Sequence, residues 1–119
     1  MDIININQKF SLFEDRWHPK IIAELNGQYV KLAKLKGEFI WHNHEHEDEL
    51  FYIVKGNLTI EFKDEIKEFH EGEMLVIPKG VDHRPIALEE VWVMLFEPVD
   101  TKHTGDITSE LTVTELEKI

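Results

Sequence analysis

The sequence predicts an all-β fold, a sandwich or barrel built from short strands. From residue 37 onward, short apolar segments are separated by turn residues at regular intervals, which is typical of these two architectures. In the segment 57–63, Leu58, Ile60 and Phe62 alternate with polar side chains, so this strand is expected to bury one face and expose the other. The 119 residues are enough for one such core. We therefore expect a single domain over residues 1–119, with its core at about 20–100.

The first pair of strands is predicted around Asn26 and Gly27. These residues separate the apolar segments IIAEL and QYVKLAKL, and Asn-Gly is the strongest two-residue signal for a β-hairpin. The alternative is a short helix that Pro19 opens and the Asn-Gly pair closes. The long apolar segment that follows favours the hairpin.

The later strands are predicted from the apolar segments that lie between turns. The segments are EFIWHNH, LFYIV, NLTIEFK, IKEF, EMLVI and VWVMLF, and the turns include Lys55-Gly56, Glu71-Gly72 and PKGVD. At the end of the chain, Thr112-x-x-Glu115 or Thr114-x-x-Glu117 is suited to cap a helix. We expect either a short C-terminal tail or a short helix there.

Some of these strands are apolar on both faces. LFYIV does not alternate, and Phe39 and Trp41 are expected on the face opposite His42 and His44. A strand that is apolar on both faces needs a second cover. The cover is either the N-terminal segment KFSLFEDRW of the same chain or a second subunit, and from the latter we expect a homodimer.

Composition excludes several classes of partner and site. The chain has 24 acidic and 13 basic residues, a formal charge of −11 and no cluster of Lys or Arg, so neither nucleic acid nor a membrane is an expected partner. It has no cysteine, so any metal would be held by nitrogen and oxygen. No signal segment or apolar span is visible, and a cytoplasmic location is the expectation.

The segment WHNHEHEDE, residues 41–49, holds three histidines and four carboxylates. In an extended strand His42 and His44 point to the same face about 6.6 Å apart, so both rings are able to reach one ion. Glu49 follows a turn and, in a hairpin, would lie opposite them. His83 follows a Pro-Gly turn and is a candidate fourth ligand from a neighbouring strand. Three imidazoles and a carboxylate suit one divalent transition metal such as Fe, Mn, Ni or Zn, with positions left open.

Two spaced motifs in this region resemble those of the cupin superfamily. They are Gly37-x4-His42-x-His44-x4-Glu49-x6-Gly56 and Gly72-x5-Pro78-x-Gly80-x2-His83, with 15 residues between Gly56 and Gly72. The first gap is four residues where the family usually has five, and Ala87 stands where the second motif often ends in Asn. Neither departure removes a ligand.

The resemblance implies a small single-domain cupin of type 2, with a jelly-roll β-barrel or sandwich around the metal. The metal ligands would be His42, His44, Glu49 and His83. The segments GEFIWHNHEHEDELFYIVKG and PKGVDHRP also look like small cupins loosely described as similar to mannose-6-phosphate isomerase, a description that reflects fold more than activity.

The surroundings of the site can be predicted from alternation. Ile40, Phe51 and Ile53 are expected on the face of the ligands, together with one of two sets, either Trp92, Met94 and Phe96 or Val91, Val93 and Leu95. Lys31, Tyr29 and Tyr52 are polar groups that could reach a cavity. Arg84 would either clamp an anionic group or form a surface ion pair, and His46 is expected to be exposed in the turn.

These observations favour a metal-binding cupin that binds a small polar molecule and transforms it by isomerase-type or dioxygenase-type chemistry. The alternative is a non-catalytic module that binds a metal or small ligand. A third hypothesis is a metal-free barrel kept for its dimeric fold.

Overall fold

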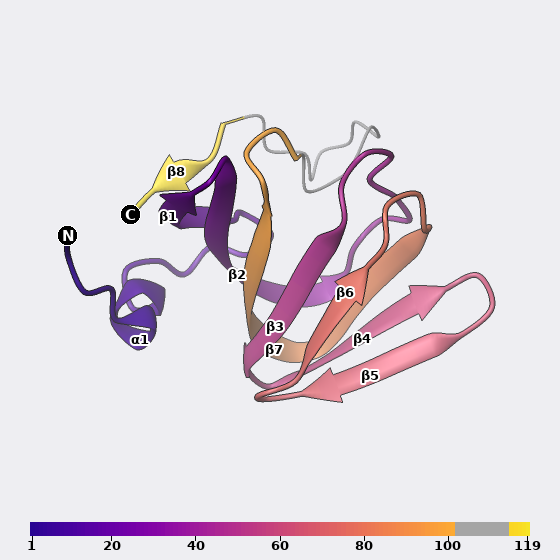
Figure 1. Cartoon of the computed structure of the whole chain (residues 1–119). Helices are drawn as coiled ribbons and strands as arrows, with labels where there is room; N and C mark the ends of the chain where they lie inside the picture. The colour runs from indigo at the N-terminus through magenta and orange to yellow at the C-terminus, as the bar shows by residue number, and fades with distance from the viewer. Residues whose placement is uncertain (102–114) are drawn as a thin grey trace.

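The computed structural model describes residues 1–101 and 115–119 of the chain. Within these residues, one short helix precedes a set of strands that form a single curled sheet (Figure 1). The elements are α1 (Ile6–Phe10), β1 (Lys20–Leu25), β2 (Gln28–Glu38), β3 (Glu49–Lys55), β4 (Asn57–Phe62), β5 (Ile66–His70), β6 (Met74–Ile77), β7 (His83–Pro98) and β8 (Glu117–Lys118). The all-β prediction is confirmed. No described helix is long and apolar enough to cross a membrane.

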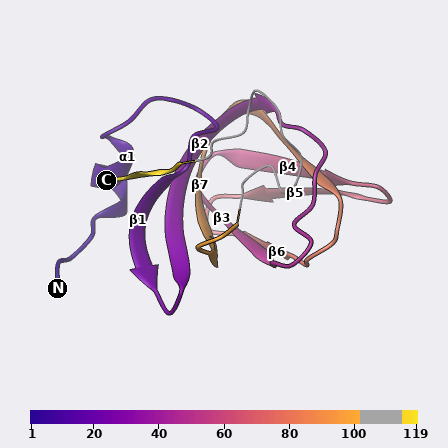
Figure 2. The same cartoon turned by 90° about the horizontal axis from the view of Figure 1, so that it is seen from above.

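The strand β7 connects the two halves of the sheet. The strand order is β5-β4-β7-β2-β1-β8, and β3 pairs with both β6 and β7. The beginning of β7 pairs with β4, from Phe62↔His83 to Thr59↔Ile86, whereas its later part pairs with β3 and β2. Seen from above, the sheet curls, with β4 and β5 on one side and β3 and β6 on the other (Figure 2).

The first hairpin forms where the sequence predicts it. Asn26 and Gly27 have φ angles of 50° and 75°, and Leu25 pairs with Gln28 across them. A two-residue turn with positive φ at both positions matches the right-handed twist of the flanking strands. The hairpin prediction is therefore confirmed, and the helical alternative is wrong.

The predicted strand EFIWHNH is wrong. β2 ends at Glu38, and of residues 39–48 only His42 forms a bridge, with His83. Gly37 has a φ of 89°, and the register of β2 against β7 shifts between Leu35 and Gly37. The backbone conformation of Gly37 is one that favours glycine, and it interrupts the regular ladder between β2 and β7. β2 ends at the next residue.

The predicted hairpin between the histidines and Glu49 is also wrong. Glu49 begins β3, but β3 pairs with β6 and β7 and not with residues 42–44. The histidine segment instead forms backbone hydrogen bonds with the start of β7, with His42 and His83 each donating N–H to the other's carbonyl at 3.0 and 2.9 Å. Glu49 and the histidines therefore approach each other through the tertiary fold.

The inner face of the sheet encloses the main apolar core. Buried side chains follow every second residue of β3 and of the later part of β7. The buried residues of this core include Phe51, Ile53, Leu58, Ile60, Val91, Val93 and Leu95. Alternation thus places one complete row of side chains in the interior, as a half-buried antiparallel strand requires.

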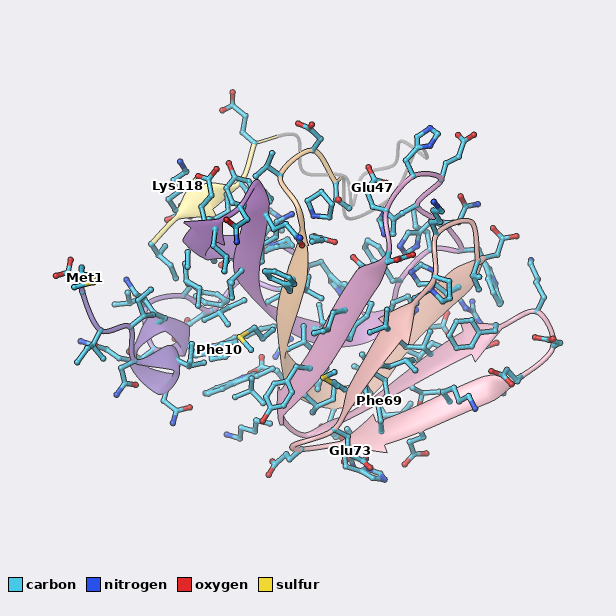
Figure 3. All side chains as sticks on the ribbon, in the orientation of Figure 1. Met1, Phe10, Glu47, Phe69, Glu73 and Lys118 are labelled. Atoms are coloured by element: carbon cyan, nitrogen blue, oxygen red, sulfur yellow. The ribbon has the colours of Figure 1, made fainter. Side chains whose placement is uncertain are left out.

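The N-terminal segment covers part of the outer face. Phe10 of α1 is fully buried and points toward the sheet (Figure 3), where it stacks on Trp92 with ring centroids 4.7 Å apart. Val54 packs against the same cluster. The same-chain cover predicted for this face is therefore present. Met74 and Val76 of β6 stay 60% and 49% exposed, and a homodimer stays a prediction.

The described end of the chain is not helical. Glu117 and Lys118 form β8, which pairs in parallel with Lys20 and Ile21 of β1. The expected helix is therefore wrong for residues 115–119, because β1 offers a free edge and Lys20 Nζ contacts Glu117 Oε1 at 3.2 Å. The proposed capping residues Thr112 and Thr114 lie outside the described residues.

Candidate metal centre

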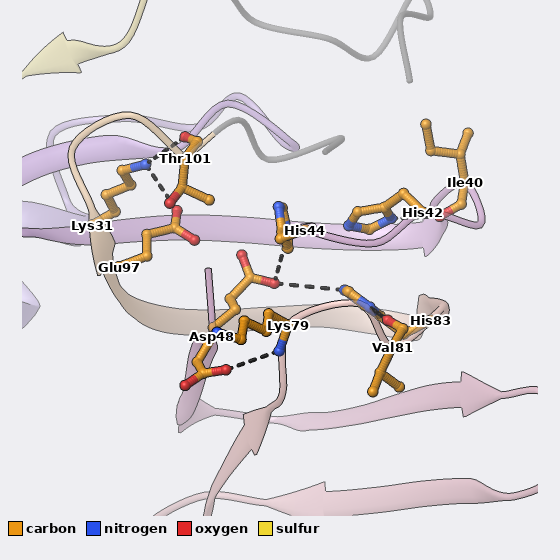
Figure 4. Close-up of polar contacts among 11 residues, drawn as sticks. Lys31, Ile40, His42, His44, Asp48, Lys79, Val81, His83, Glu97 and Thr101 are labelled. Carbon is orange, nitrogen blue, oxygen red and sulfur yellow. Dashed lines mark hydrogen bonds and ion pairs between the residues drawn. The ribbon is translucent and has the colours of Figure 1, made fainter. Parts of the chain in front are cut away.

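The four metal ligands predicted from the sequence lie close together inside the curled sheet. His42, His44, Glu49 and His83 are all buried, and one potential ligand atom from each lies within 4.8 Å of the others. Glu49 Oε1 is 3.3 Å from His44 Nε2 and 3.6 Å from His83 Nε2. Figure 4 shows the three imidazole rings around this point, with dashed lines for the two contacts of the glutamate. This group could hold a metal ion.

Each of these residues is positioned by a different part of the backbone. Glu49 opens β3 on the strand's buried face, and His83 opens β7. His42 is held by its bridge to His83. The His44 carbonyl accepts a hydrogen bond from the Gly80 N–H at 2.8 Å, and Gly80 has a φ of 79°. The turn before β7, for which glycine is suited, thus anchors the segment that carries His44.

Two of the imidazoles are oriented by backbone carbonyls. His42 Nδ1 lies 2.9 Å from the Ile40 carbonyl oxygen, and His83 Nδ1 lies 2.9 Å from that of Val81. A carbonyl only accepts, so each Nδ1 carries the proton and donates it. A ring held in this way can offer the lone pair of its Nε2, which is the arrangement of metal-binding histidines.

Three buried atoms at the centre have no hydrogen-bond partner among the described residues. They are His44 Nε2, His83 Nε2 and Glu49 Oε1. Their separations of 3.3 and 3.6 Å exceed the usual length of a hydrogen bond, about 2.7–3.2 Å. Buried polar atoms without partners are rare because each costs free energy. A cation among them would satisfy all three, so the residues fit a metal site.

The electrostatics of the histidines differ. Burial, assisted by the nearby His83, lowers the pKa of His42 to about 4, so this ring is neutral at pH 7. Burial also acts to lower the pKa of His44, but the contact with the Glu49 carboxylate outweighs it and the pKa of His44 is raised. The pKa of Glu49 lies well below its ordinary value because its contacts with the histidines outweigh its burial.

A buried ion pair that the sequence reasoning missed lies beside this group. Lys31 of β2 and Glu97 of β7 have fully buried side chains, with Nζ and Oε1 2.8 Å apart (Figure 4). Burial and the neighbouring Glu49 charge raise the pKa of Glu97 well above its ordinary value, and Lys31 offsets part of this effect. Lys31 had been predicted to reach a cavity. Glu97 could have been found by extending the inward row Val91, Val93 and Leu95 by two residues.

An apolar cavity of about 30 Å³ adjoins two of the ligands. The predicted wall residue Phe51 lines it, and of the two sets in β7 the inward one is Val91, Val93 and Leu95. Ile53 lies in the same core, but Ile40 is not among the lining residues. The described residues that line the cavity are Trp17, Pro19, Ala33, Leu35, Phe39, His42, Glu49, Phe51, Pro85, Val93 and Leu95.

The predicted orientation of Phe39 is wrong. Phe39 is 5% exposed, and its ring lies edge-on to that of His42 with centroids 5.3 Å apart. It faces the histidine because residues 39–41 are not a regular strand, so strict alternation does not hold there. Trp41 is partly buried and lies under the side chains of Lys63 and Arg84.

The remaining polar candidates lie away from the ligand group. Arg84 Nη2 contacts Glu61 Oε1 at 2.8 Å and Arg84 Nη1 contacts Glu38 at 3.7 Å, so Arg84 forms the predicted ion pair. The side chain of His46 is 80% exposed, as predicted. Both residues are therefore engaged with the surface.

Comparisons with known proteins agree with this geometry. A family model described as "Cupin domain" matches residues 28–104. The crystal structure of a cupin-2 domain containing protein from Shewanella frigidimarina is 50% identical, covers 81% of this chain and 94% of that chain, and has a TM-score of 0.80. A protein from Neisseria meningitidis is 34% identical, with coverage of 82% and 99% and a TM-score of 0.75.

One curated relative matches over a shorter region. Uncharacterized protein YdbB of Bacillus subtilis is 45% identical over 64 residues, 53% of this chain and 57% of its own. The match thus spans just over half of that relative's length. With the structural neighbours, the expected jelly-roll fold is confirmed. The looser likeness to mannose-6-phosphate isomerase is not confirmed.

Proposed function

Because this chain belongs to the cupin domain family, we propose that it holds one divalent transition metal and binds a small molecule at the metal's open positions. The proposed ligands are His42, His44, Glu49 and His83. The observation that carries the proposal is the set of three buried atoms without partners at one point. Three nitrogen ligands and one oxygen ligand suit Fe, Mn, Ni or Zn.

The chain's own residues determine what such a site does. A metal there would supply Lewis-acid chemistry or, if it is redox-active, electron transfer. His42 and His83 have their Nε2 atoms available as ligands because backbone carbonyls accept hydrogen bonds from their Nδ1 atoms. The adjoining cavity is lined mainly by apolar residues. These properties support isomerase-type or dioxygenase-type turnover.

A non-catalytic binding module is the second candidate. The observation in its favour is that, among the described residues, the cavity is lined by no acid or base other than His42 and Glu49. The nearby Glu97 is held in an ion pair with Lys31. Without a free group to move a proton, the site would bind a small ligand and release it unchanged.

Metal analysis tests the proposal. Tag-free protein purified without added metal or chelator should contain close to one equivalent of a transition metal per chain. His42→Ala should lose it, and His83→Ala should weaken binding strongly. His46→Ala is the matched control, because its side chain lies in the same segment but is 80% exposed, and it should keep the metal. Protein that binds no metal after reloading, or a His42→Ala variant that binds as tightly as the parent, would contradict the proposal.

Turnover separates the two candidates. The metal-loaded protein is incubated with small oxygen-containing substrates, with and without dioxygen, beside a folded Glu49→Gln variant. Substrate-dependent turnover that the variant lacks would establish an enzyme. Binding without any product would favour the module.

Three further expectations belong to this proposal. Residues 1–119 form one cupin domain, the protein is cytoplasmic, and it forms a homodimer. The exposed Met74 and Val76 on β6 support the dimer, because they extend an apolar face that α1 leaves uncovered. Sedimentation of the parent and of Val76→Lys measures it, and a parent that stays monomeric at all concentrations would contradict it.

A further inference from the structure

The cavity beside the metal ligands is apolar except at one end. His42 and Glu49 form that end, and the other lining residues among those described are apolar. Neither Lys nor Arg is among the described residues that line it. A ligand that enters this space would therefore meet polar groups only at the metal ligands.

The cations nearest to the site are already paired. Lys31 is fully buried against Glu97, and Arg84 contacts Glu61 at 2.8 Å. A phosphate group needs several charge-assisted donors to replace its water. The described part of the chain offers none of these at the cavity, so the surroundings do not suit a phosphorylated ligand.

Charge balance favours a ligand with a single negative charge. A divalent metal with neutral histidines and the Glu49 carboxylate leaves one net positive charge in a buried place. An uncompensated buried charge is costly, and one carboxylate oxygen at an open position would neutralise it.

Trp17 forms the outer wall of the cavity. It is the lining residue that is partly exposed, whereas the other described lining residues are buried. Its ring stacks on Phe39 with centroids 4.6 Å apart and planes 12° from parallel. Its backbone φ is 62°, a conformation that is unusual for a bulky residue and persists only where surrounding contacts enforce it.

Two hydrogen bonds hold Trp17 in this position. Its backbone N–H donates to the Lys34 carbonyl and its indole Nε1–H donates to the Lys36 carbonyl, both at 2.9 Å. The cavity behind it has a volume of about 30 Å³. The position of the indole therefore limits how large an apolar group the cavity takes.

We propose that the site takes a small monocarboxylate with a short apolar chain, whose carboxylate lies at the metal and whose chain lies in the cavity, and that Trp17 sets the upper limit of chain length. This inference rests on the proposed metal-binding function. It names a ligand class and a specificity-determining residue, and it excludes sugar phosphates as the preferred ligands.

A chain-length series on Co²⁺-loaded protein tests the inference. The visible absorption of Co²⁺ is followed while acetate, propionate, butyrate, hexanoate, inorganic phosphate or glycerol phosphate is added. Affinity should rise about threefold to fourfold for each added methylene, the factor expected when a methylene leaves water, and then fall once the chain exceeds the cavity. The phosphates should bind more weakly than butyrate.

Variants of Trp17 and Trp41 test which residue sets the upper limit of chain length. Trp17→Ala should move the optimum to longer chains by at least one methylene, and Trp17→Phe, which keeps an aromatic ring, should lie between it and the parent. Trp41→Ala is the matched control, because Trp41 is partly buried outside the cavity, and it should leave the optimum unchanged. If Trp17→Ala does not fold, the optimal chain lengths of Trp17→Phe and of the parent still test the proposal.

Several results would overturn the inference. They are an affinity that does not depend on chain length, phosphate esters that bind as tightly as butyrate, or an optimum that neither Trp17 variant moves. An unchanged Co²⁺ spectrum with every carboxylate would also overturn it while leaving the metal site in place. If Co²⁺ fails to bind at one equivalent, or binds equally well to His42→Ala, the proposed function itself fails.

Discussion

The interior of the curled sheet contains two groups of buried polar side chains. They differ in how many of their polar atoms have a partner within the described part of the chain. Lys31 Nζ and Glu97 Oε1 are in contact at 2.8 Å, so the buried cation has a partner within the chain, although Glu97 Oε2 has no hydrogen-bond partner among the described residues. The group around Glu49 instead leaves three buried atoms without partners at one point. The first group is balanced by the protein itself. The second fits a cation from outside the chain, the metal proposed above.

The two groups also differ in the backbone that carries them. Lys31 and Glu97 lie within the regular parts of β2 and β7, where ladder hydrogen bonds hold both strands. His42 and His44 lie outside the strands, and Glu49 and His83 lie at strand ends. Binding residues are commonly found on loops and strand ends that a rigid scaffold positions. The comparison teaches that the group carried by a regular strand ladder is paired within the chain, whereas the group carried by strand ends and the segment between them is not.

Breaking the ion pair should have the largest effect on stability. Lys31→Met removes the partner of the buried Glu97 carboxyl, whose pKa is already raised well above its ordinary value, so this group takes up a proton and is left unsatisfied. We expect the free energy of unfolding to fall by about 1–3 kcal/mol, the cost of an unsatisfied buried polar group. Urea denaturation measures it. The double variant Lys31→Met/Glu97→Leu removes both polar groups and should recover most of the loss. A Lys31→Met variant with the same free energy of unfolding as the parent would contradict a stabilising role for the Lys31–Glu97 contact.

Metal should stabilise the second group and leave the first unaffected. At a free metal concentration of 100 times the dissociation constant, the folded state gains about 2.7 kcal/mol. Thermal denaturation with and without Zn²⁺ or Mn²⁺ should therefore show a rise in Tm for the parent and none for His44→Ala. The double variant of the ion pair should show the parent's rise, since its metal ligands are intact. An equal rise in His44→Ala would place the metal elsewhere.

The pH dependence of metal affinity sharpens the comparison further. The Glu49 contact raises the pKa of His44 above its ordinary value of 6.5, so the metal-free ring holds a proton that the metal must displace. The pKa of His42 is about 4, so that ring is already neutral. Affinity should therefore rise with pH through the pKa of His44, by up to tenfold or about 1.4 kcal/mol per pH unit, and then level off.

Chelator competition between pH 6 and 8 measures this dependence. Affinity is expected to rise with pH, because the metal must displace the proton that the raised pKa of His44 favours, whereas the His42 ring is already neutral. His44→Ala keeps too little affinity to serve as the control, so the exposed His46→Ala is used and should show the parent's slope. Affinity that is constant over the whole range would contradict the assignment of the proton to His44.

A surface ion pair should matter least. Arg84→Gln breaks contacts with Glu61 and Glu38, where water and salt already screen the charges. We expect no change in metal affinity and little change in the urea midpoint. Loss of metal in this variant would show that the surface beside His83 contributes more to the site than its contacts indicate.

Local sequence patterns predicted a large part of the fold. The Asn26-Gly27 hairpin and the strands with alternating apolar residues are present because turn chemistry and burial of one face act over a few neighbouring residues. The strand predicted for the histidines is absent, because Gly37 ends the regular β2 conformation and the segment bonds to β7 instead. That bonding is not visible in the segment's own sequence.

The candidate site divides in the same way. The identities of His42, His44, Glu49 and His83 followed from spacing and ligand chemistry. Phe39 beside His42 and the wall formed by Trp17 did not, because both residues belong to irregular segments whose side-chain directions no period describes. Glu97 follows the alternation of β7, but its partner Lys31 is 66 residues away in the sequence.

The sequence by itself determined which residue types are available as ligands, where the turns fall and which strand faces are apolar, because these depend on neighbours a few residues apart. Only the tertiary structure decided which residues meet. The curled sheet brings β3, β7 and the segment 39–48 to one point, and the pairing of strands distant in the chain sets the geometry there. Burial then makes the three atoms that lack a hydrogen-bond partner among the described residues costly, and this cost, which exists only in the folded chain, supports the proposed metal site.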